Sequence, residues 1–517
     1  MSVVVINLGL KSIRCIAFDP SGKKLISVSR PVHTQLRSRE VEQDANEWLN
    51  LCRDVVAEAS SGLQEQIDAV TVTTSASCLV PVDELGRPTH PVLMVSDSRS
   101  VDQAEELRAH DEFQDAVTET GLPFTPDLML PKLLWLRRHA PKVFDSTRYF
   151  LSPGDFLAFH LTGHAVIDTN NALKFHAVRN GAGEYMYHSG LLSFVGVDED
   201  RLPVIAPPGT TLGTVTREAA RSFGLPESTK VILGTYDALC ALVGSGVATE
   251  GLAAVVSGTV TSVRALARNP VTNLPRGILR SEWIEAAQDL VVVGGSNNLG
   301  GGLIEWHKQA FYYDVGGDPY ALMDRESTTV PPGSGGLLFL PYLLGERAPV
   351  WDSEARGIFF GLDRRHTRCH FTRAVFESVG FSTRHILEHI ESAVGKVAEL
   401  RFSGGLARIP HVVKIQADIL QAPVCVPSEF ETTALGAHIL AECARGSYAT
   451  VLEACEKMVS IGSVHEPDPN VANLYNDMFD LYKQLYADTR LLQKSRNALL
   501  KRFPDFLDSG VATRENL

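Results

Sequence analysis

The chain has 517 residues, of which 44% are apolar and 21% are charged, and its formal net charge is −13. This length predicts two or three domains, and a negative charge without basic clusters argues against a nucleic-acid partner. The apolar runs are too short to cross a bilayer, the first residues lack the basic lead of a signal peptide, and the eight cysteines lack metal-binding spacing, so we expect a cytoplasmic protein with no membrane partner.

The first half of the chain predicts strands that alternate with helices. Residues 3–19 have the pattern of a strand, a glycine-bearing turn and a second strand. Residues 44–62 have helical spacing, and residues 69–73 form a candidate buried strand. Residues 128–144 and 152–162 predict two further helices. This alternation predicts an α/β fold.

The centre of the chain carries the residues with the clearest chemistry. A strand at residues 231–233 is followed by Tyr236 and Asp237, and a second strand ends in Ser-Gly-Thr at residues 257–259. Amides and hydroxyls in a tight glycine turn suit phosphate oxygens, and a nearby carboxylate suits removal of a proton from a hydroxyl. Together they indicate phosphoryl transfer to an alcohol. The alternative is that Asp237 caps a helix and that the glycine turn is only a hairpin.

Two hairpins that are far apart in the chain share one pattern. Residues 3–18 (VVVINLGLKSIRCIAF) and residues 252–267 (LAAVVSGTVTSVRALA) each have an apolar strand, a turn with a glycine and a hydroxyl, and an apolar strand that contains an arginine. Such a repeat predicts two similar domains that face each other across a nucleotide cleft, as in the actin-like (ribonuclease H-like) folds. Two unrelated hairpins are the alternative.

The second half adds two glycine-bearing segments after predicted strands. Residues 294–302 are glycine-rich and precede a helix, which lets a flat group approach the backbone; a flexible loop is the alternative. Gly404 and Gly405 follow a strand and open a helix, whose N-terminal amides suit an anion. Residues 471–492 predict an amphipathic helix for core packing or a dimer face. Its predicted apolar side consists of Leu474, Tyr475, Met478, Leu481, Tyr482 and Leu485.

Nearly the whole chain resembles the FGGY carbohydrate kinases, through the segments GTYDALCALVGSG, VVSGTVTSV, LPYLLGERAPVWDSEARGIFFGL, FSGGLARIPHVVKIQADIL and TTALGAHILA. A further segment, PKLLWLRRHAPKVF, resembles the xylulokinases, whereas GERAPVWD and the glycine-rich run resemble the gluconate kinases about equally well. The resemblance implies two actin-like domains with a nucleotide cleft between them. The expected domains are residues 1–246 for sugar binding, with the catalytic base near the end, 247–447 for nucleotide binding, and a helical extension at 448–517.

The resemblance also implies roles for individual residues. Asp237 matches the catalytic base, which would accept the proton of the sugar hydroxyl that attacks the γ-phosphate of ATP. The residues that match the nucleotide site are Gly9, Lys11, Ser12, Gly258, Thr259, Gly301, Glu305, Gly404, Gly405 and Ile409. Those expected around the sugar are Ala76, Ser77, Asp97, Arg99, Tyr236 and Asp237. ATP and Mg²⁺ are the expected cofactors, with Asn7 holding the metal through water.

Three places depart from the family pattern. The first phosphate loop of the family usually begins with Asp and carries Thr after the glycine, but this chain has Asn7, Leu10 and Lys11. Asn lacks the charge that favours Mg²⁺, and Lys11 is either a point charge for a phosphate or a solvated turn lysine. The xylulokinase Met-His pair is replaced by alanine and serine at residues 76–77, and a usual aromatic residue is Val95, so we expect smaller sugar contacts.

We therefore expect an ATP-dependent sugar kinase that converts D-xylulose to D-xylulose 5-phosphate, with gluconate or another ketose or polyol as the alternative substrate. A catalytically weak sugar- or nucleotide-binding homologue is the alternative of another class, because the first phosphate loop is degenerate. A filament-forming actin relative is disfavoured, since the sugar-kinase segments around Asp97 and Gly345 would have no purpose in it. The expected partners are a small-molecule sugar and ATP, and the amphipathic C-terminal helix is compatible with a homodimer.

Overall fold

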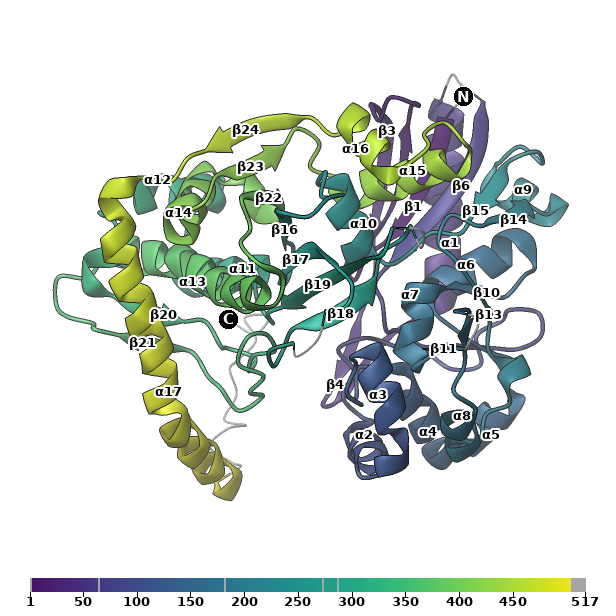
Figure 1. Cartoon of the computed structure of the whole chain (residues 1–517), viewed down its shortest axis with the longest axis horizontal. Helices are drawn as coiled ribbons and strands as arrows, with labels where there is room; N and C mark the ends of the chain where they lie inside the picture. Colours follow the sequence, from purple (N-terminus) through teal and green to yellow (C-terminus); the bar gives the residue numbers. More distant parts are fainter. Residues whose placement is uncertain (1, 64–65, 181–182, 272–273, 286–287, 504–517) are drawn as a thin grey trace.

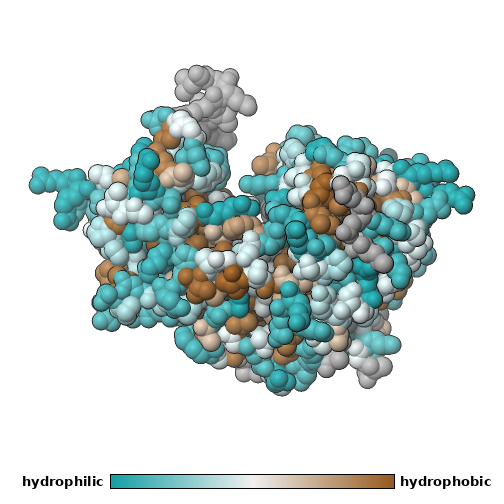
Figure 2. Space-filling view, turned by 90° about the horizontal axis from the view of Figure 1, so that it is seen from above, coloured by the Kyte–Doolittle hydropathy of each residue, from teal (hydrophilic) through white to brown (hydrophobic). Residues whose placement is uncertain are grey.

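The chain is described by a computed structural model that covers residues 2–63, 66–180, 183–271, 274–285 and 288–503. Its described part has two α/β halves, each with a central sheet. Figure 1 shows the N-terminal half in purple and blue beside the C-terminal half in green and yellow. The space-filling view in Figure 2 shows a notch between the two halves, with apolar side chains gathered in the middle of this face.

The N-terminal half is built on a six-stranded sheet of described strands in the order β14-β15-β6-β1-β2-β3. β1 and β2 form an antiparallel hairpin, β6 runs parallel to β1, and β15 runs parallel to β6. Every residue of β1 is buried, as expected for a central strand that is covered on both faces. The strands are β1 (Ser2–Leu8), β2 (Ser12–Phe18), β3 (Lys24–Pro31), β6 (Ile67–Thr74), β14 (Thr211–Thr214) and β15 (Lys230–Ile232).

Three helices pack on the outer face of this sheet: α1 (Ala45–Gly62), α6 (Pro153–Thr162) and α9 (Arg217–Phe223). α1 begins after Asp44, whose side chain accepts the backbone N–H of Asn46, and it buries Trp48 in the core. α6 begins with a capping box between Ser152 and Asp155. The helices predicted near residues 44–62 and 152–162 are thereby confirmed.

The N-terminal half also carries a helical region with a hydrophobic core of its own. The single helix predicted at residues 128–144 is wrong, because α4 ends at His139 and Pro141 begins a second helix, where its missing N–H costs nothing. The elements outside the sheet are β4 (Gln35–Arg37), β5 (Glu40–Gln43), β7 (Val80–Val82), β8 (Val92–Leu93), α2 (Val101–Arg108), α3 (Gln114–Thr120), α4 (Met129–His139), α5 (Pro141–Ser146), β9 (Tyr149–Leu151), β10 (Val166–Asp168), α7 (Thr169–Ala172), β11 (Val178–Arg179), β12 (Tyr185–Met186), α8 (Ser189–Val195) and β13 (Val204–Ala206).

The C-terminal half repeats this strand arrangement. Its described strands form a seven-stranded sheet in the order β18-β19-β17-β16-β22-β23-β24, in which β16 and β17 form the hairpin and β22 runs parallel to β16. The order β3-β2-β1-β6-β15 of one half thus corresponds to β19-β17-β16-β22-β23 of the other, which confirms the predicted repeat and the α/β fold. The strands are β16 (Leu252–Ser257), β17 (Thr261–Arg268), β18 (Leu279–Glu282), β19 (Leu290–Ser296), β22 (Glu399–Gly404), β23 (Val424–Pro427) and β24 (Ile461–His465).

A large core fills the outer side of the second sheet, where the long helix α13 crosses it. The helices and remaining strands of this layer are α11 (Gly301–Phe311), α12 (Pro319–Thr328), β20 (Leu338–Leu340), β21 (Ile358–Phe360), α13 (Arg368–Val394) and α14 (Pro410–Leu420). The helix predicted after the glycine-rich run at residues 294–302 is thereby confirmed.

Two helices rich in small residues, α10 (Asp237–Gly244) and α15 (Thr432–Ala444), lie between the two sheets. Their core joins Val5 and Phe18 of the first sheet with Leu266 of the second. The helices touch backbone to backbone: a Cβ atom on Gly244 would lie 1.8 Å from the carbonyl oxygen of Thr432, and one on Gly436 would lie 1.8 Å from that of Cys240. Only glycine fits at this crossing.

The C-terminal extension packs against the second half instead of standing apart from it. β24 joins the sheet edge, and α17 (Ala472–Arg502) packs on the core of that half. α16 (Val451–Met458) packs beside α10 and α15 in the core between the two sheets. α17 is longer than the predicted residues 471–492, and its buried side includes Tyr475 and Tyr482 but not Leu474 and Leu481, which are 40% and 41% exposed. Within the described residues, no helix combines the length and the apolar character that a membrane span requires.

A buried ion pair within α13 is joined to α17 through the Tyr475 hydroxyl. Glu377 is 1% exposed, and its Oε1 accepts hydrogen bonds of 2.9 Å from Arg373 Nε and from the Tyr475 hydroxyl. We expect Glu377→Ala to lower the free energy of unfolding by about 3–5 kcal/mol, because it leaves a buried guanidinium without its partner. Glu388→Ala on the same helix removes a half-exposed pair with Lys483 and should cost less than about 1 kcal/mol. Equal losses in urea unfolding would contradict this expectation.

Candidate active site

Asp237 lies at the first turn of α10, just after the strand β15. Residues 233–236 connect the strand to the helix, and a bridge joins Tyr236 to Thr74 at the end of β6. The Asp237 side chain is partly exposed, and its Oδ2 accepts a hydrogen bond of 3.2 Å from the Ser75 hydroxyl. The carboxylate is therefore open on one side and is held on the other side by the end of the neighbouring strand.

The surroundings of Asp237 make it a better proton acceptor than an exposed aspartate. Burial raises its pKa above the ordinary value of 3.8, and the Arg264 guanidinium, the Ser75 hydroxyl and the Ala238 N–H partly offset that rise. A carboxylate with a raised pKa suits a general base. Arg264 belongs to β17, so a charge from the second half acts on this carboxylate of the first half.

Three of the predicted nucleotide-site glycines have open space beside their Cα atoms. A Cβ atom placed on Gly9, Gly258 or Gly405 would find its nearest neighbour 3.5, 4.0 or 3.9 Å away. Gly258 and Gly405 are also exposed. A backbone that is bare on one side lets a phosphate approach its N–H groups closely. These turns therefore fit an anionic nucleotide.

The glycine-rich run at residues 294–302 is a packed connection between β19 and α11 instead of a free loop. The N–H groups of Gly300 and Gly301 donate to the carbonyl oxygens of Thr259 and Gly258, at 2.9 and 2.7 Å. A Cβ atom on Gly301 would lie 2.7 Å from the Gly258 oxygen. Glycine is thus required for the close approach of the two backbones, and the run holds the turn at residues 258–259 in place.

Other predicted nucleotide residues have partners within the fold. Gly404 pairs with Ser257 across β22 and β16 at a φ of 90°, which favours glycine. The Glu305 carboxylate accepts hydrogen bonds from Lys308 and from the Tyr320 hydroxyl. Ile409 is 7% exposed and packs in the core at the start of α14. Contacts of these residues with a nucleotide stay predictions.

The first phosphate turn adjoins the residue that holds the carboxylate. Asn7 lies near the end of β1 and is 8% exposed, whereas Lys11 is exposed in the turn. The Gly9 N–H donates to the Ser12 oxygen at 3.0 Å, which closes the turn. The Ser75 N–H donates to Leu8 at 3.3 Å, so the turn and Asp237 share this strand end. Among the described residues, no group of three or more His, Cys, Asp or Glu side chains could hold a metal.

Asp97 and Arg99 form a buried pair beside the predicted sugar region. Arg99 Nη2 lies 2.7 Å from Asp97 Oδ2, which also accepts the N–H of Val41 at 2.7 Å. The Arg99 guanidinium lies 2.7 Å from Glu42 as well and stacks over the Trp135 ring at 4.9 Å. These contacts brace the strands and α4 around the region, and a direct contact with a sugar stays a prediction.

Lys132 of α4 ties together three loops of the predicted sugar region. Its Nζ donates to the carbonyl oxygens of Ser77, Met94 and Asp127 at 2.5, 2.8 and 3.1 Å, and the side chain is fully buried. Burial lowers the pKa of Lys132, and the neighbouring Cys78, Asp127 and Asp97 partly offset this. Ser77 has a φ of 62°, and Ala76 beside it is partly buried against the inter-sheet core. Lys132 therefore sets the positions of loops that the resemblance assigns to the sugar.

Tyr236 joins the two halves next to Asp237. The ring is buried, and its hydroxyl lies 3.2 Å from Ser281 Oγ of β18 in the second sheet. The Lys174 ammonium lies 5.4 Å from the centre of the ring. Tyr236 thus contacts Lys174 of the first half and Ser281 of the second half.

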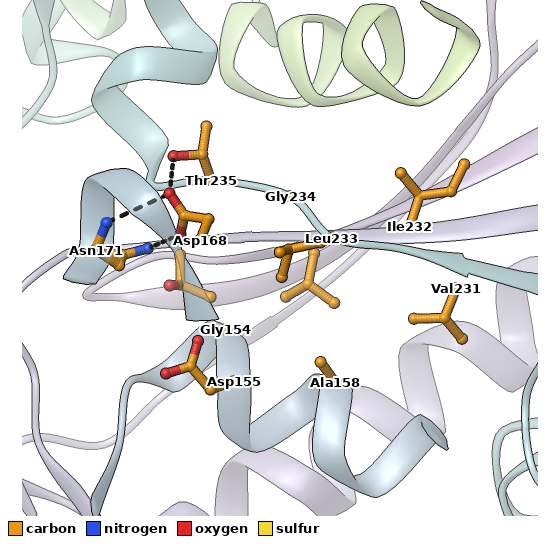
Figure 3. A pocket seen from close by; sticks show the side chains of 12 residues that line it. Gly154, Asp155, Ala158, Asp168, Asn171, Val231, Ile232, Leu233, Gly234 and Thr235 are labelled. Carbon is orange, nitrogen blue, oxygen red and sulfur yellow. Dashed lines mark hydrogen bonds between the residues drawn. The ribbon is translucent and has the colours of Figure 1, made fainter. Parts of the chain in front are cut away.

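A buried polar network supports the backbone just before Asp237, in the small cavity of Figure 3. Asp168 Oδ1 accepts the Thr235 hydroxyl at 2.8 Å, and its Oδ2 accepts the Asn171 amide at 2.6 Å. Asp155 lies on the opposite wall beside Gly154. The two carboxyls are both fully enclosed, so burial raises the pKa of Asp168 and raises that of Asp155 to about 8.

We expect the raised pKa of Asp155 to make the protein less stable as pH rises. The folded state holds a proton on Asp155 that the unfolded state releases above pH 3.8, so stability is full below that pH and is lost up to about pH 8. The slope should be at most about 1.4 kcal/mol per pH unit. Urea unfolding measures the change in the free energy of unfolding between pH 5 and pH 8. This change should be smaller for Asp155→Asn than for the wild type or for Asp54→Asn on the surface. An equal change in all three proteins would contradict the expectation.

The structure brings together several residues that sequence reasoning missed. Ser75, Lys132 and Arg264 contact or face the region of Asp237, and Asp168 supports it through Thr235. Lys132 and Arg264 each stand in an otherwise apolar run, and a charge in such a run was the signal that could have identified them. Asp168 had no such signal, because its partner is far away in the sequence.

Comparison with known proteins matches the two halves of the chain to the two domains of one protein family. The N-terminal domain of the FGGY family of carbohydrate kinases matches residues 2–244, and its C-terminal domain matches residues 253–445. A xylulose kinase of Bacillus subtilis is 26% identical over 97% of this chain and 99% of that protein. A gluconokinase of the same organism is also 26% identical, over 94% of this chain and 95% of that protein.

Solved structures have the same two-domain fold. A xylulose kinase from Rhodospirillum rubrum has a TM-score of 0.85 at 26% identity and covers 96% of this chain and 100% of that chain. A gluconate kinase from Lactobacillus acidophilus has a TM-score of 0.85 at 24% identity and covers 94% of this chain and 98% of that chain. The fold class and the resemblance inferred from the sequence are therefore confirmed.

Proposed function

Because this chain belongs to the FGGY family of carbohydrate kinases, we propose that it transfers the γ-phosphate of ATP to a hydroxyl of a five- or six-carbon ketose or sugar acid. The observation that carries the proposal is the Asp237 carboxylate. It is open on one side, lies where the two halves meet, and has a pKa that burial raises.

The proposed chemistry assigns Asp237 the role of general base. Its carboxylate accepts the proton of the sugar hydroxyl as that oxygen attacks the γ-phosphorus. Ser75 holds Oδ2, which leaves the other carboxylate oxygen free to face the sugar. The turns at Gly9, Gly258 and Gly405 would bind the phosphates through backbone N–H groups. Closure of the halves would exclude water and align the reacting groups.

Mg²⁺ is proposed as the metal that accompanies ATP and neutralises charge on its phosphates. The described residues offer no cluster of acidic ligands for it, which fits an ion held mainly by the phosphates and by water. Asn7 would contact this ion through water, and Lys11 would add a charge near the phosphates. The domain limits 1–246, 247–447 and 448–517 also stay proposals, and residues 504–517 of the extension lie outside the described part.

The substrate is proposed from relatives that are divided between xylulose and gluconate. A screen with detection of the phosphorylated product, using ATP, Mg²⁺ and a panel of pentuloses, polyols and sugar acids, tests the proposal. We expect product with at least one member of the panel. ATP binding without any phosphorylated product would instead favour a sugar- or nucleotide-binding homologue that has lost turnover.

A further inference from the structure

Arg264 is a charged residue in an apolar strand that the proposed reaction does not use. In β17, Val263 and Ala265 face the outer core, and Leu266 faces the core around α10. Since side chains alternate along a strand, Arg264 lies on the same face as Leu266, toward α10 and the first half. A Cβ atom on Gly294, its partner on β19, would lie 2.6 Å from Arg264 Cγ, so glycine there leaves room for the arginine stem.

The Arg264 guanidinium has no partner within the described part of the chain. Its Nη1 is buried and makes no hydrogen bond, and no ion pair of Arg264 is found there. An arginine keeps its charge at any physiological pH. A buried donor without an acceptor is costly, which indicates that an anion from outside the chain completes this site.

A second guanidinium group, that of Arg347, lies near Arg264. Burial lowers the pKa of Arg347, and the positive charge of Arg264 lowers it further, so the two guanidinium groups are close enough to repel each other. The acid that acts on Arg264 is Asp237, and the acids that act on Arg347 are Asp127 and Glu346. Among the described residues, none of these acids forms an ion pair with Arg264, and its buried Nη1 has no hydrogen-bond partner. This nitrogen suits a substrate that brings its own negative charge.

We propose that Arg264 determines specificity by binding the carboxylate of the substrate, which makes the substrate class a sugar acid of the aldonate type. This inference rests on the proposed sugar kinase activity. The planar guanidinium would bind the carboxylate with two parallel hydrogen bonds. The rest of the sugar chain would extend toward Asp237, which deprotonates the accepting hydroxyl.

The position of Arg264 favours the sugar over the phosphates of ATP. It lies three residues into β17 from Thr261, about 10 Å along the strand from the turn that is predicted to hold phosphate. Across the sheet, Arg264 pairs with Gly294 and Gly294 pairs with Leu279. Leu279 packs against Leu122, Leu128 and Leu173 of the first half, next to the loops that Lys132 holds. Arg264 thus lies at the sugar end of the site.

Matched substrates test the proposal, because D-gluconate and D-glucitol differ only in the acid group at C1, as do D-xylonate and xylitol. Calorimetry should show that the wild-type enzyme binds an aldonate at least about tenfold more tightly than its polyol. Arg264→Gln should lower kcat/KM for the aldonate by about 10- to 100-fold and leave the KM for ATP unchanged. Arg264→Lys should restore part of the loss. Arg268→Gln, at the exposed end of the same strand, is the matched control and should change neither value.

The failures of the two proposals can be told apart. A wild-type enzyme that phosphorylates D-xylulose and binds polyols as tightly as aldonates would overturn the role of Arg264 and leave the kinase activity standing. A variant whose main defect is a higher KM for ATP would assign the guanidinium to the phosphates instead. If no sugar is phosphorylated, the proposed function falls, but preferential binding of the aldonate by the wild type still supports the carboxylate site. Because the wild-type comparison requires no variant, a variant that fails to fold does not prevent the test.

Discussion

Asp237→Asn is expected to lower turnover by about 10²- to 10⁴-fold and to leave sugar binding nearly unchanged. The amide keeps the shape of the side chain and can still accept the Ser75 hydroxyl, but it cannot take a proton from the attacking hydroxyl. Single-turnover kinetics with detection of the phosphorylated sugar measure the loss, and calorimetry measures sugar binding. Because burial raises the pKa of this base, the wild-type rate should fall on the acid side at a pH above 3.8.

Asp54→Asn is the matched control for this experiment, since Asp54 is exposed on α1 and far from the proposed chemistry in the sequence and the fold. Its turnover should equal that of the wild type. If Asp237→Asn kept more than about a tenth of the wild-type turnover, another group would have to be the base. A loss of sugar binding equal to the loss of turnover would indicate a binding role instead.

Lys132→Met is the second change with a large expected effect. It removes the common donor of the Ser77, Met94 and Asp127 carbonyl oxygens, which then remain buried without a partner. We expect the free energy of unfolding to fall by on the order of 3 kcal/mol. We also expect kcat/KM for the sugar to fall by about 10- to 100-fold, because the three loops lose their relative positions.

The KM for ATP separates positioning from a general loss of structure. It should stay near the wild-type value in Lys132→Met, because the predicted phosphate turns are not bound to Lys132. Lys142→Met, on the exposed surface of α5, controls for the loss of a lysine and should change neither stability nor kinetics. Equal increases in both KM values would show that Lys132 supports the fold as a whole and not the sugar loops.

The architecture could be predicted from the sequence because each apolar strand and its glycine turn form a local pattern. The two hairpins around Gly9 and Gly258 repeat one arrangement of apolar strand and glycine turn, and the structure pairs both in the same way. The break at Pro141 was missed because α4 and α5 continue one apolar pattern across it. The side chains that point inward from α17 were only partly predicted, since its neighbours are distant in the sequence.

The supporting contacts of the candidate site could not be predicted for the same reason. Ser75 and Asp237 are 162 positions apart, and Lys132 meets the Ser77 oxygen across 55. Residues with a polar side chain at a strand end are common, so nothing local marks Ser75 as the partner of Asp237. The spacing that does carry information is the alternation along β17, which places Arg264 on the inner face once the sheet is known.

The glycine contact between α10 and α15 has a mechanical consequence. Where Gly244 and Gly436 meet, the helices touch through backbone atoms, so no side chain at this crossing has to change rotamer when the helices turn on each other. The contact is thus suited to act as a hinge, and closure of the two halves would cost little free energy at this contact. A single methyl group at either position would clash with the backbone of the other helix and would push the two halves of the enzyme apart.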